Sequence, residues 1–385
     1  MSILTQEQTK RIADRVLSLS KADECIVGVE GNRIGNIRFA RNAVSTAGLA
    51  DDTRVQVQVA FGKRQGTATI NEFDDKSLER AVRRAEDLAR LAPENPEFMP
   101  AIAKTGYKGS ETFVPATSAI DPEYRAQAAA YAMEACRKKG LVAAGFFTDR
   151  SSFETVANSN GVFGHQTATS LDFTCTVRTE DGRGSGWVKR SARDVAKFDP
   201  REAAEVAIEK ALRSVEAKAL EPGRYTVIME PAATSDLIGF MLNGFSARSA
   251  DEGRSFLSKQ GGANRLGDKL FDQQVNIWSD PWDKDVPVLP WDNDMLPRER
   301  MHLVKDGRIN ELNYSQFWAK KKGQRAVGSA GNIIMAGTDK STAELIANTK
   351  KGILVTRTWY IRMVDPQSVL LTGLTRDGTF YVENG

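Results

Sequence analysis

The first 220 residues contain an internal duplication, and this repeat restricts the folds that they can adopt. Each half reads as a helix, a run of about five short strands and a second helix. RFARNAV (38–44) resembles TVANSNGV (155–162), and residues 60–85 resemble residues 178–211 once a gap is allowed. Repeats of this size are unlike the units of a solenoid. The sequence therefore predicts an N-terminal domain, 1–220, built from two similar α–β–α lobes.

Alternating polar and apolar residues mark the strands of this domain. Val55, Val57 and Val59 alternate with glutamines, as in a strand that has one face in water. Helices are expected at 6–20 and 75–91, where apolar residues recur on one face. Strands are expected at 25–30, 34–40, 44–50, 55–61 and 66–71 in the first half, and at 141–149, 154–158, 171–178 and 186–191 in the second.

Two further helices have recognisable start signals. Asp121 is a suitable N-cap, Pro122 occupies the first helical position, and Gly140 follows the expected end of this helix. Asp199 and Glu202 have the spacing of a capping box, in which each side chain bonds to the backbone amide of the other residue. We therefore expect one helix to begin after each aspartate.

After Pro222-Gly223 the sequence pattern changes. Residues 224–230 fit a short strand and residues 231–245 an apolar helix, followed by scattered short strands, Gly and Asn turns and one helix near 342–349. The hairpin-like spacing of the strands favours antiparallel sheets over a parallel doubly wound sheet. The predicted fold class is therefore α+β, with a second, mostly antiparallel β domain over 221–385.

Composition excludes several classes of protein. The net charge is +3, from 53 basic and 50 acidic residues, and no basic cluster of the kind that binds nucleic acid stands out. No segment has the roughly 18 apolar residues that a membrane span needs, and the N-terminus reads as an amphipathic helix. Cys25, Cys136 and Cys175 form no CxxC pair, which indicates a reducing compartment. We expect a cytoplasmic chain that binds neither nucleic acid nor membrane.

The residues by themselves identify no catalytic centre. Catalytic zinc usually takes three protein ligands, mainly histidines, whereas this chain has two histidines, His165 and His302, and no HExxH. We interpret both as structural or surface residues, with a carboxylate site for Ca²⁺ or Mg²⁺ at DNDM (292–295) as an alternative. No GxSxG motif is present, and Cys136 and Cys175 lie where buried structural thiols are common.

Three tryptophans, Trp278, Trp282 and Trp291, lie close together in a proline-containing stretch. One interpretation is a loop that buried indole rings fix to the body of the protein. The functional alternative is the lining of a groove or an interface, because tryptophan is enriched at interfaces. The sequence favours the first interpretation and leaves the second open.

Five segments resemble the TldD/PmbA family of peptidase subunits, which is also called modulator of DNA gyrase or peptidase U62. These segments are residues 38–71, 156–164, 229–281, 331–355 and 370–385, in the order of the family. The resemblance implies two domains, a cytoplasmic setting, dimerisation and a metallopeptidase complex that acts on unfolded or extended peptides. In such a complex the TldD-like subunit binds a metal, expected to be zinc, through HExxxH on a helix, and the PmbA/TldE-like subunit does not.

The helix predicted at 231–245 carries the position of that motif. Aligned on Gly239, the two histidines fall on Ser235 and Phe240, and the glutamate falls on Asp236. Phe240 offers no lone pair and Ser235 is a weak ligand, so these residues are unsuited to a transition metal. The apolar residues of the same helix fit a buried packing helix. We therefore predict no catalytic residue and no metal or other cofactor in this chain.

These residues lead to the hypothesis of a non-catalytic PmbA/TldE-like subunit that pairs with a TldD-like catalytic subunit. Two alternatives stay open: a stand-alone hydrolase with unidentified catalytic residues, and a homodimeric peptide-binding protein. The resemblance further implies a β segment after the equivalent of Gly385, so we expect the second domain to be shortened at its end.

Overall fold

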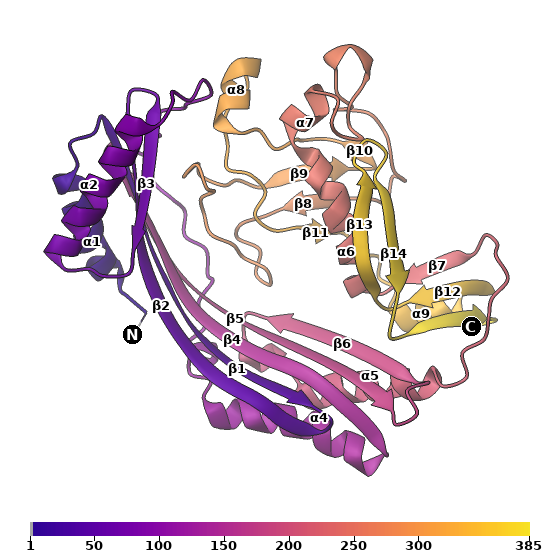
Figure 1. Cartoon of the computed structure of the whole chain (residues 1–385). Helices are drawn as coiled ribbons and strands as arrows, with labels where there is room; N and C mark the ends of the chain where they lie inside the picture. Colours follow the sequence, from indigo (N-terminus) through magenta and orange to yellow (C-terminus); the bar gives the residue numbers. More distant parts are fainter. Residues whose placement is uncertain (1–2) are drawn as a thin grey trace.

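The computed structural model describes residues 3–385, and its largest feature is one curved six-stranded sheet (Figure 1). The strand order is β3-β2-β1-β4-β5-β6, and all neighbours are antiparallel. The central strands β1 and β4 pair with Asn32 opposite Ser152, so an approximate two-fold axis between them relates the two halves. The strands are β1 (Glu24–Ala40), β2 (Ala43–Phe61), β3 (Arg64–Ile70), β4 (Leu141–Asn158), β5 (Phe163–Thr179) and β6 (Ser185–Ala192).

Each half supplies two long strands and one shorter strand to this sheet, so the prediction of about five short strands per half was wrong. β1 runs unbroken through Gly31 and β2 through Asp52, where glycine and polar residues suggested turns. Both sides of β1 are hydrogen-bonded, to β2 and β4, and this pairing outweighs weak local strand preference. Glycine is also required by the packing of β1 against the ring of Phe153, because a Cβ on Gly31 would lie 2.6 Å from that ring.

Four helices cover the convex face of the sheet (Figure 1): α1 (Gln6–Leu19), α2 (Asp75–Leu91), α4 (Pro122–Lys138) and α5 (Pro200–Arg213). The first two bury one apolar core and the last two bury another. Asp121 caps α4 as predicted, and Asp199 caps α5. The capping box was wrong, because the carboxylate of Glu202 pairs with the guanidinium of Arg190 at 2.6 Å instead of bonding the N-cap amide.

A pair of glycines confirms that the two halves are built alike. Gly66 of β3 lies against α2, where an added Cβ would be 2.2 Å from the carbonyl oxygen of Ala85. Gly186 of β6 lies against α5, and its Cβ would be 2.2 Å from the carbonyl oxygen of Ala207. In both halves the helix backbone therefore approaches the third strand too closely for a side chain at the glycine position.

The chain between α2 and α4 is mostly irregular and contains the short helix α3 (Pro115–Ser118). Within residues 3–385 no helix is long and apolar enough to cross a membrane. All three cysteines are buried and free. After β6 and the short turn η1 (Val195–Lys197), α5 leads into the second part of the molecule, which lies on the concave side of the sheet (Figure 1).

This second part contains three small sheets, and eight of its nine strands have an antiparallel neighbour. The α+β class with a mostly antiparallel second part is therefore confirmed; β7 alone pairs only in parallel, with β12. The sheets contain β7 (Thr226–Met229), β12 (Lys351–Val355) and β15 (Thr379–Glu383); β8 (Ile277–Ser279), β9 (Met301–Lys305), β10 (Arg308–Ile309) and β11 (Ile334–Met335); and the hairpin β13 (Thr358–Asp365) and β14 (Leu370–Thr375). The helical segments are α6 (Pro231–Leu242), η2 (Asn243–Phe245), α7 (Ala247–Asp251), η3 (Gln260–Gly262), α8 (Gln316–Lys322) and α9 (Thr342–Ala347).

Candidate functional site

The three positions that replace the metal motif lie together on α6, at a cavity of about 380 Å³ between α6, β6 and β13. We call it the α6 cavity. α6 begins at Pro231 and ends at Leu242 rather than at Phe245. The residues that line the α6 cavity are Trp187, Lys189, Ala232, Ser235, Asp236, Phe240, Arg357, Thr358, Trp359, Tyr360, Ile361 and Arg362.

The oxygen atoms of α6 in this cavity are already engaged in hydrogen bonds. The hydroxyl of Thr358 donates to Oδ2 of Asp236 at 2.5 Å. The hydroxyl of Ser235 donates to the carbonyl oxygen of Ala232 at 3.0 Å, one turn earlier on the helix. Phe240 contributes only an aromatic ring. The helix therefore offers one carboxylate and one hydroxyl, which is short of the three protein ligands typical of catalytic zinc.

Cationic side chains surround the same cavity. The guanidinium of Arg357 lies 4.2 Å from the ring centroid of Trp187 and 4.6 Å from that of Trp359. It also pairs with the buried carboxylate of Asp377 at 2.6 Å. Burial lowers the pKa of Arg357, and Asp377 opposes that shift. With Lys189 and Arg362 also in the lining, the cavity repels divalent cations, so these residues do not fit the zinc that the family implies.

The apolar residues of α6 are half-buried, which is less than the prediction of a buried packing helix, and Ile238, Met241 and Leu242 pack against the core of the second part. Ala233 is the one buried residue of α6, although Leu237, Ile238, Phe240 and Met241 follow it. α6 packs beside β13, and the neighbouring strands β7, β13 and β14 also expose apolar side chains. An apolar helix becomes fully buried only where the fold covers it completely, and composition alone does not show how complete that cover is. The exposed residues on these strands include Val227, Tyr360, Val364, Leu370 and Leu374.

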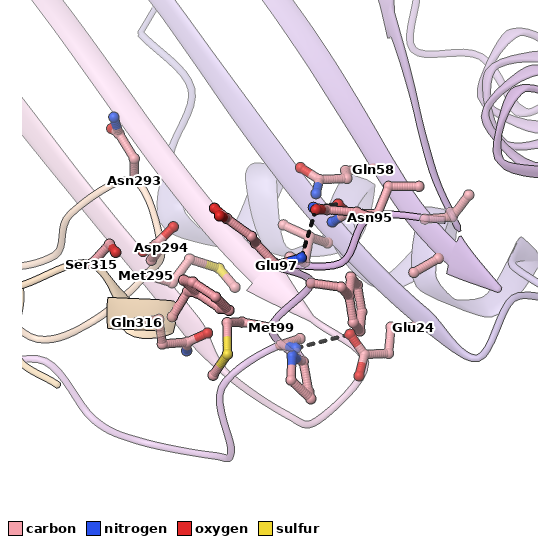
Figure 2. Close-up of a pocket in the computed structure, with 18 of the residues that line it drawn as sticks. Glu24, Gln58, Asn95, Glu97, Met99, Asn293, Asp294, Met295, Ser315 and Gln316 are labelled. Carbon is pink, nitrogen blue, oxygen red and sulfur yellow. Dashed lines mark hydrogen bonds between the residues drawn. The ribbon is translucent and has the colours of Figure 1, made fainter. Parts of the chain in front are cut away.

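A larger cavity of about 570 Å³ lies on the concave face of the sheet (Figure 2). We call it the sheet cavity. One wall comes from β1, β2 and residues 95–101, and the other from residues 293–295 and the start of α8. Figure 2 shows Glu24, Gln58 and Asn95 on the first wall, facing Asp294 and Gln316 on the second. Side-chain amides and carboxylates therefore dominate its polar surface.

Ion pairs and burial set the charge of the sheet cavity. Glu97 accepts two hydrogen bonds from the guanidinium of Arg248, at 2.6 and 2.8 Å, and Glu24 accepts one from the amide of Ala101 at 2.8 Å. Burial raises the pKa of Asp294, and the nearby carboxylate of Asp292 raises it further. Both effects favour the neutral form of the Asp294 carboxyl group.

The structure does not bring the three predicted tryptophans into one cluster. Trp291 is buried, and its Nε1 donates to the carboxylate of Glu154 on β4 at 3.1 Å. Trp282 donates to the carbonyl oxygen of Lys108 at 3.0 Å, and Trp278 lies in β8. Trp291 and Trp282 thus fasten their loop to the sheet and to the connection after α2. The tryptophans that line the α6 cavity, Trp187 and Trp359, were not identified from the sequence.

The two histidines lie in different elements and share no site. His165 lies in β5, where its Nδ1 is 2.7 Å from the hydroxyl of Thr155, and burial lowers its pKa. His302 lies in β9. Residues 3–385 contain no group of three or more His, Cys, Asp or Glu side chains placed to hold a metal. At DNDM, Asp292 instead accepts backbone amides, including that of Leu296 at 3.0 Å.

Comparison with known proteins identifies the family of the chain. Three family models match consecutive parts: PmbA/TldA metallopeptidase domain 1 at residues 25–89, the central domain at 71–215 and the C-terminal domain at 222–385. This chain belongs to the PmbA/TldD metallopeptidase family. Metalloprotease PmbA of Escherichia coli O157:H7 is 21% identical over 407 residues, which cover 100% of this chain and 88% of that protein.

Solved structures of similar proteins share the fold of this PmbA/TldD chain. A proposed modulator of a DNA gyrase from Thermotoga maritima MSB8 has a TM-score of 0.85 at 19% identity, with 98% of this chain and 88% of the other covered. TldE from Thermococcus kodakarensis has a TM-score of 0.83 at 17% identity, with 98% and 88% covered. A proposed modulator of DNA gyrase from Bacteroides thetaiotaomicron VPI-5482 reaches 0.83 at 20% identity, with 99% and 88% covered.

Proposed function

We propose that this chain is the non-catalytic, PmbA/TldE-like subunit of a TldD/TldE-type metallopeptidase complex that acts on unfolded or extended peptides. The observation that carries the proposal is the chemistry of the α6 cavity. Asp236 is bonded to Thr358, Phe240 has no ligand atom, and Arg357 and Lys189 add positive charge. A metal-dependent hydrolase needs a site that holds the ion and leaves one position open for water, so the metal belongs to the partner.

The exposed apolar side chains of the β13–β14 hairpin, together with the half-buried ones of α6, support a partner subunit. Tyr360 is 63% exposed and Leu374 is 66% exposed, and both belong to this hairpin next to α6 (Figure 1). Contiguous apolar surface of this kind marks interaction sites in soluble proteins. We assign this surface to the TldD-like subunit. That subunit would cover α6 and place its own metal site next to the concave face of the sheet.

The sheet cavity supports a peptide ligand. Its lining includes the side-chain amides of Gln56, Gln58, Gln65, Asn95 and Gln316. Each amide can both donate and accept hydrogen bonds, as a peptide backbone requires whatever its sequence. In the proposed complex this surface holds an extended peptide while the partner subunit cleaves it.

Metal analysis and a cleavage assay test the proposal together. The purified chain, dialysed and assayed by elemental analysis, is expected to retain no stoichiometric metal and to leave unfolded, fluorescently labelled casein intact. Adding an HExxxH-bearing relative from the same genome is expected to give a stable heterodimer that cleaves the casein. Stoichiometric zinc in this chain alone would contradict the proposal. Chelator-resistant cleavage by the lone chain would favour a stand-alone hydrolase. A pull-down with the tagged chain that recovers only further copies of the same chain would favour a homodimeric binding protein.

A charge on α6 tests the docking surface. Phe240→Lys is expected to weaken capture of the HExxxH-bearing subunit by about tenfold or more, because the ammonium must lose water at an apolar interface. Leu91→Lys is the matched control, since Leu91 is 84% exposed on the distant helix α2. Equal capture by both variants, measured by surface plasmon resonance, would remove α6 from the interface.

A further inference from the structure

The two outer edges of the sheet are covered differently. In the second half, β6 pairs with β5 from residue 171 to 178, and an extended segment before α3 meets the uncovered part of the β5 edge. The amide of Thr169 donates to the carbonyl oxygen of Thr112 at 2.9 Å. The hydroxyl of Thr112 donates to the carbonyl oxygen of Thr167 at 2.5 Å. A piece of the chain itself therefore covers this edge.

The equivalent edge in the first half lacks such a cover. β3 pairs with β2 only from Val55 to Phe61. Residues 43–50 of β2 pair with β1 on one side, and within residues 3–385 no strand pairs with their other side. All eight are exposed, including Val44 at 49% and Leu49 at 56%.

This open edge has little of the usual protection against pairing. An edge strand presents unpaired N–H and C=O groups, and proteins commonly blunt it with lysine, proline or a bulge. Residues 43–50 read AVSTAGLA and contain no charged residue and no proline. The β1–β2 register shifts once inside this stretch, where Val44 pairs with Phe39 and Thr46 with Arg38, so that Ser45 forms a bulge and residues 46–50 continue in regular pairing with β1. This stretch is therefore suited to accept another strand.

We propose that residues 43–50 of β2 bind an extended segment of an unfolded polypeptide by strand addition. The β5 edge indicates the kind of occupant, because there a single segment fills the equivalent position through a backbone bond from Thr169 to Thr112 and through bonds of threonine hydroxyls. The proposal rests on the proposed function in one respect, namely that the segment belongs to the peptide substrate. Backbone pairing gives affinity with little demand on sequence, as a complex acting on varied unfolded chains requires.

Hydrogen exchange with a synthetic peptide tests this site directly. The probe has the sequence of residues 108–114, KGSETFV, which includes the segment that covers the β5 edge. It is expected to slow the exchange of amides 43–50, whereas a backbone N-methylated version binds about tenfold more weakly or worse because it lacks the donors. Leu49→Lys is expected to abolish the protection, and Leu212→Lys, 49% exposed on α5, is expected to leave it unchanged.

Three results would overturn the strand-addition site. They are unchanged exchange at residues 43–50, equal protection by the two peptides, and equal protection in both lysine variants. A dimer in sedimentation that Leu49→Lys dissociates, with amides 43–50 protected in it, would assign the edge to a second copy instead. The experiment uses this chain without metal or partner subunit, so its failure is distinct from failure of the proposed function.

Discussion

Two helices of similar length, α5 and α6, follow each other in the chain and relate to the rest of the molecule in opposite ways. Both have proline in the first turn. α5 buries five residues against β5 and β6, while α6 buries one, although α6 is richer in large apolar residues. A helix whose apolar residues match its buried face contributes to the fold. A helix whose apolar residues exceed its buried face indicates a surface for another molecule.

The largest difference is expected in the loss of stability when a phenylalanine is truncated in the core under α5 or on α6. Phe173 is fully buried in the core under α5, so Phe173→Ala is expected to lower the free energy of unfolding by about 3–5 kcal/mol. Phe240 on α6 is only half-buried, and Phe240→Ala should cost less than about 1 kcal/mol in the isolated chain. Urea denaturation of both variants measures this. Equal losses would mean that α6 belongs to the folding core.

Local signals in the sequence predicted the covering helices well. The starts of α4 and α5 were predicted correctly because Asp121 and Asp199 act on amides within their own first turns. The duplication was also visible, since the second half repeats the residue pattern of the first. The helix starts depend on neighbours within a few positions, and the repeat on a comparison of the sequence with itself, so the sequence shows both directly.

Features that depend on distant residues were not predictable in the same way. β1 continues through Gly31 because strands on both sides pair with it, and the capping box failed because Arg190 competes for Glu202. The α6 cavity draws Trp187 from β6 and Trp359 from β13. The sequence indicated Ser235 and Phe240 through the family resemblance, but which side chains face them depends on tertiary packing.

A second comparison between α5 and α6 uses two glycines: Gly186, which packs against α5, and Gly239, which lies within α6. Gly186→Ala places a Cβ 2.2 Å from the carbonyl oxygen of Ala207 on α5, so the helix must move, at a cost of about 1–3 kcal/mol. Gly66→Ala should cost a similar amount, because its Cβ meets α2 at the same distance. Thermal unfolding of both variants checks this. A neutral Gly186→Ala would show that α5 can shift on the sheet.

Within α6 the same substitution is expected to have the opposite sign. An added Cβ on Gly239 has no heavy atom within 4 Å outside its own helix, so Gly239→Ala should stabilise the isolated chain by about 0.5–1 kcal/mol through helix propensity. Loss of stability instead would reveal a contact that covers α6 in the free chain.

The smallest effect is expected at the ion pair that joins the two helices. Nζ of Lys210 on α5 lies 2.7 Å from the carboxylate of Glu230, the N-cap residue of α6, and the two side chains are 12% and 24% exposed. A double-mutant cycle with Lys210→Met and Glu230→Gln is expected to give a coupling energy of about 1 kcal/mol, near the upper end for partly exposed pairs.

This last measurement separates the position of α6 from its apolar surface. Because the pair fixes only the first turn of α6, its loss should weaken capture of the partner subunit by no more than about tenfold, the equivalent of roughly 1.4 kcal/mol. Phe240→Lys changes the contact surface and should have the larger effect. If the Lys210→Met variant loses the partner as completely as Phe240→Lys, then the orientation that α5 imposes on α6, rather than the apolar residues of α6, determines docking.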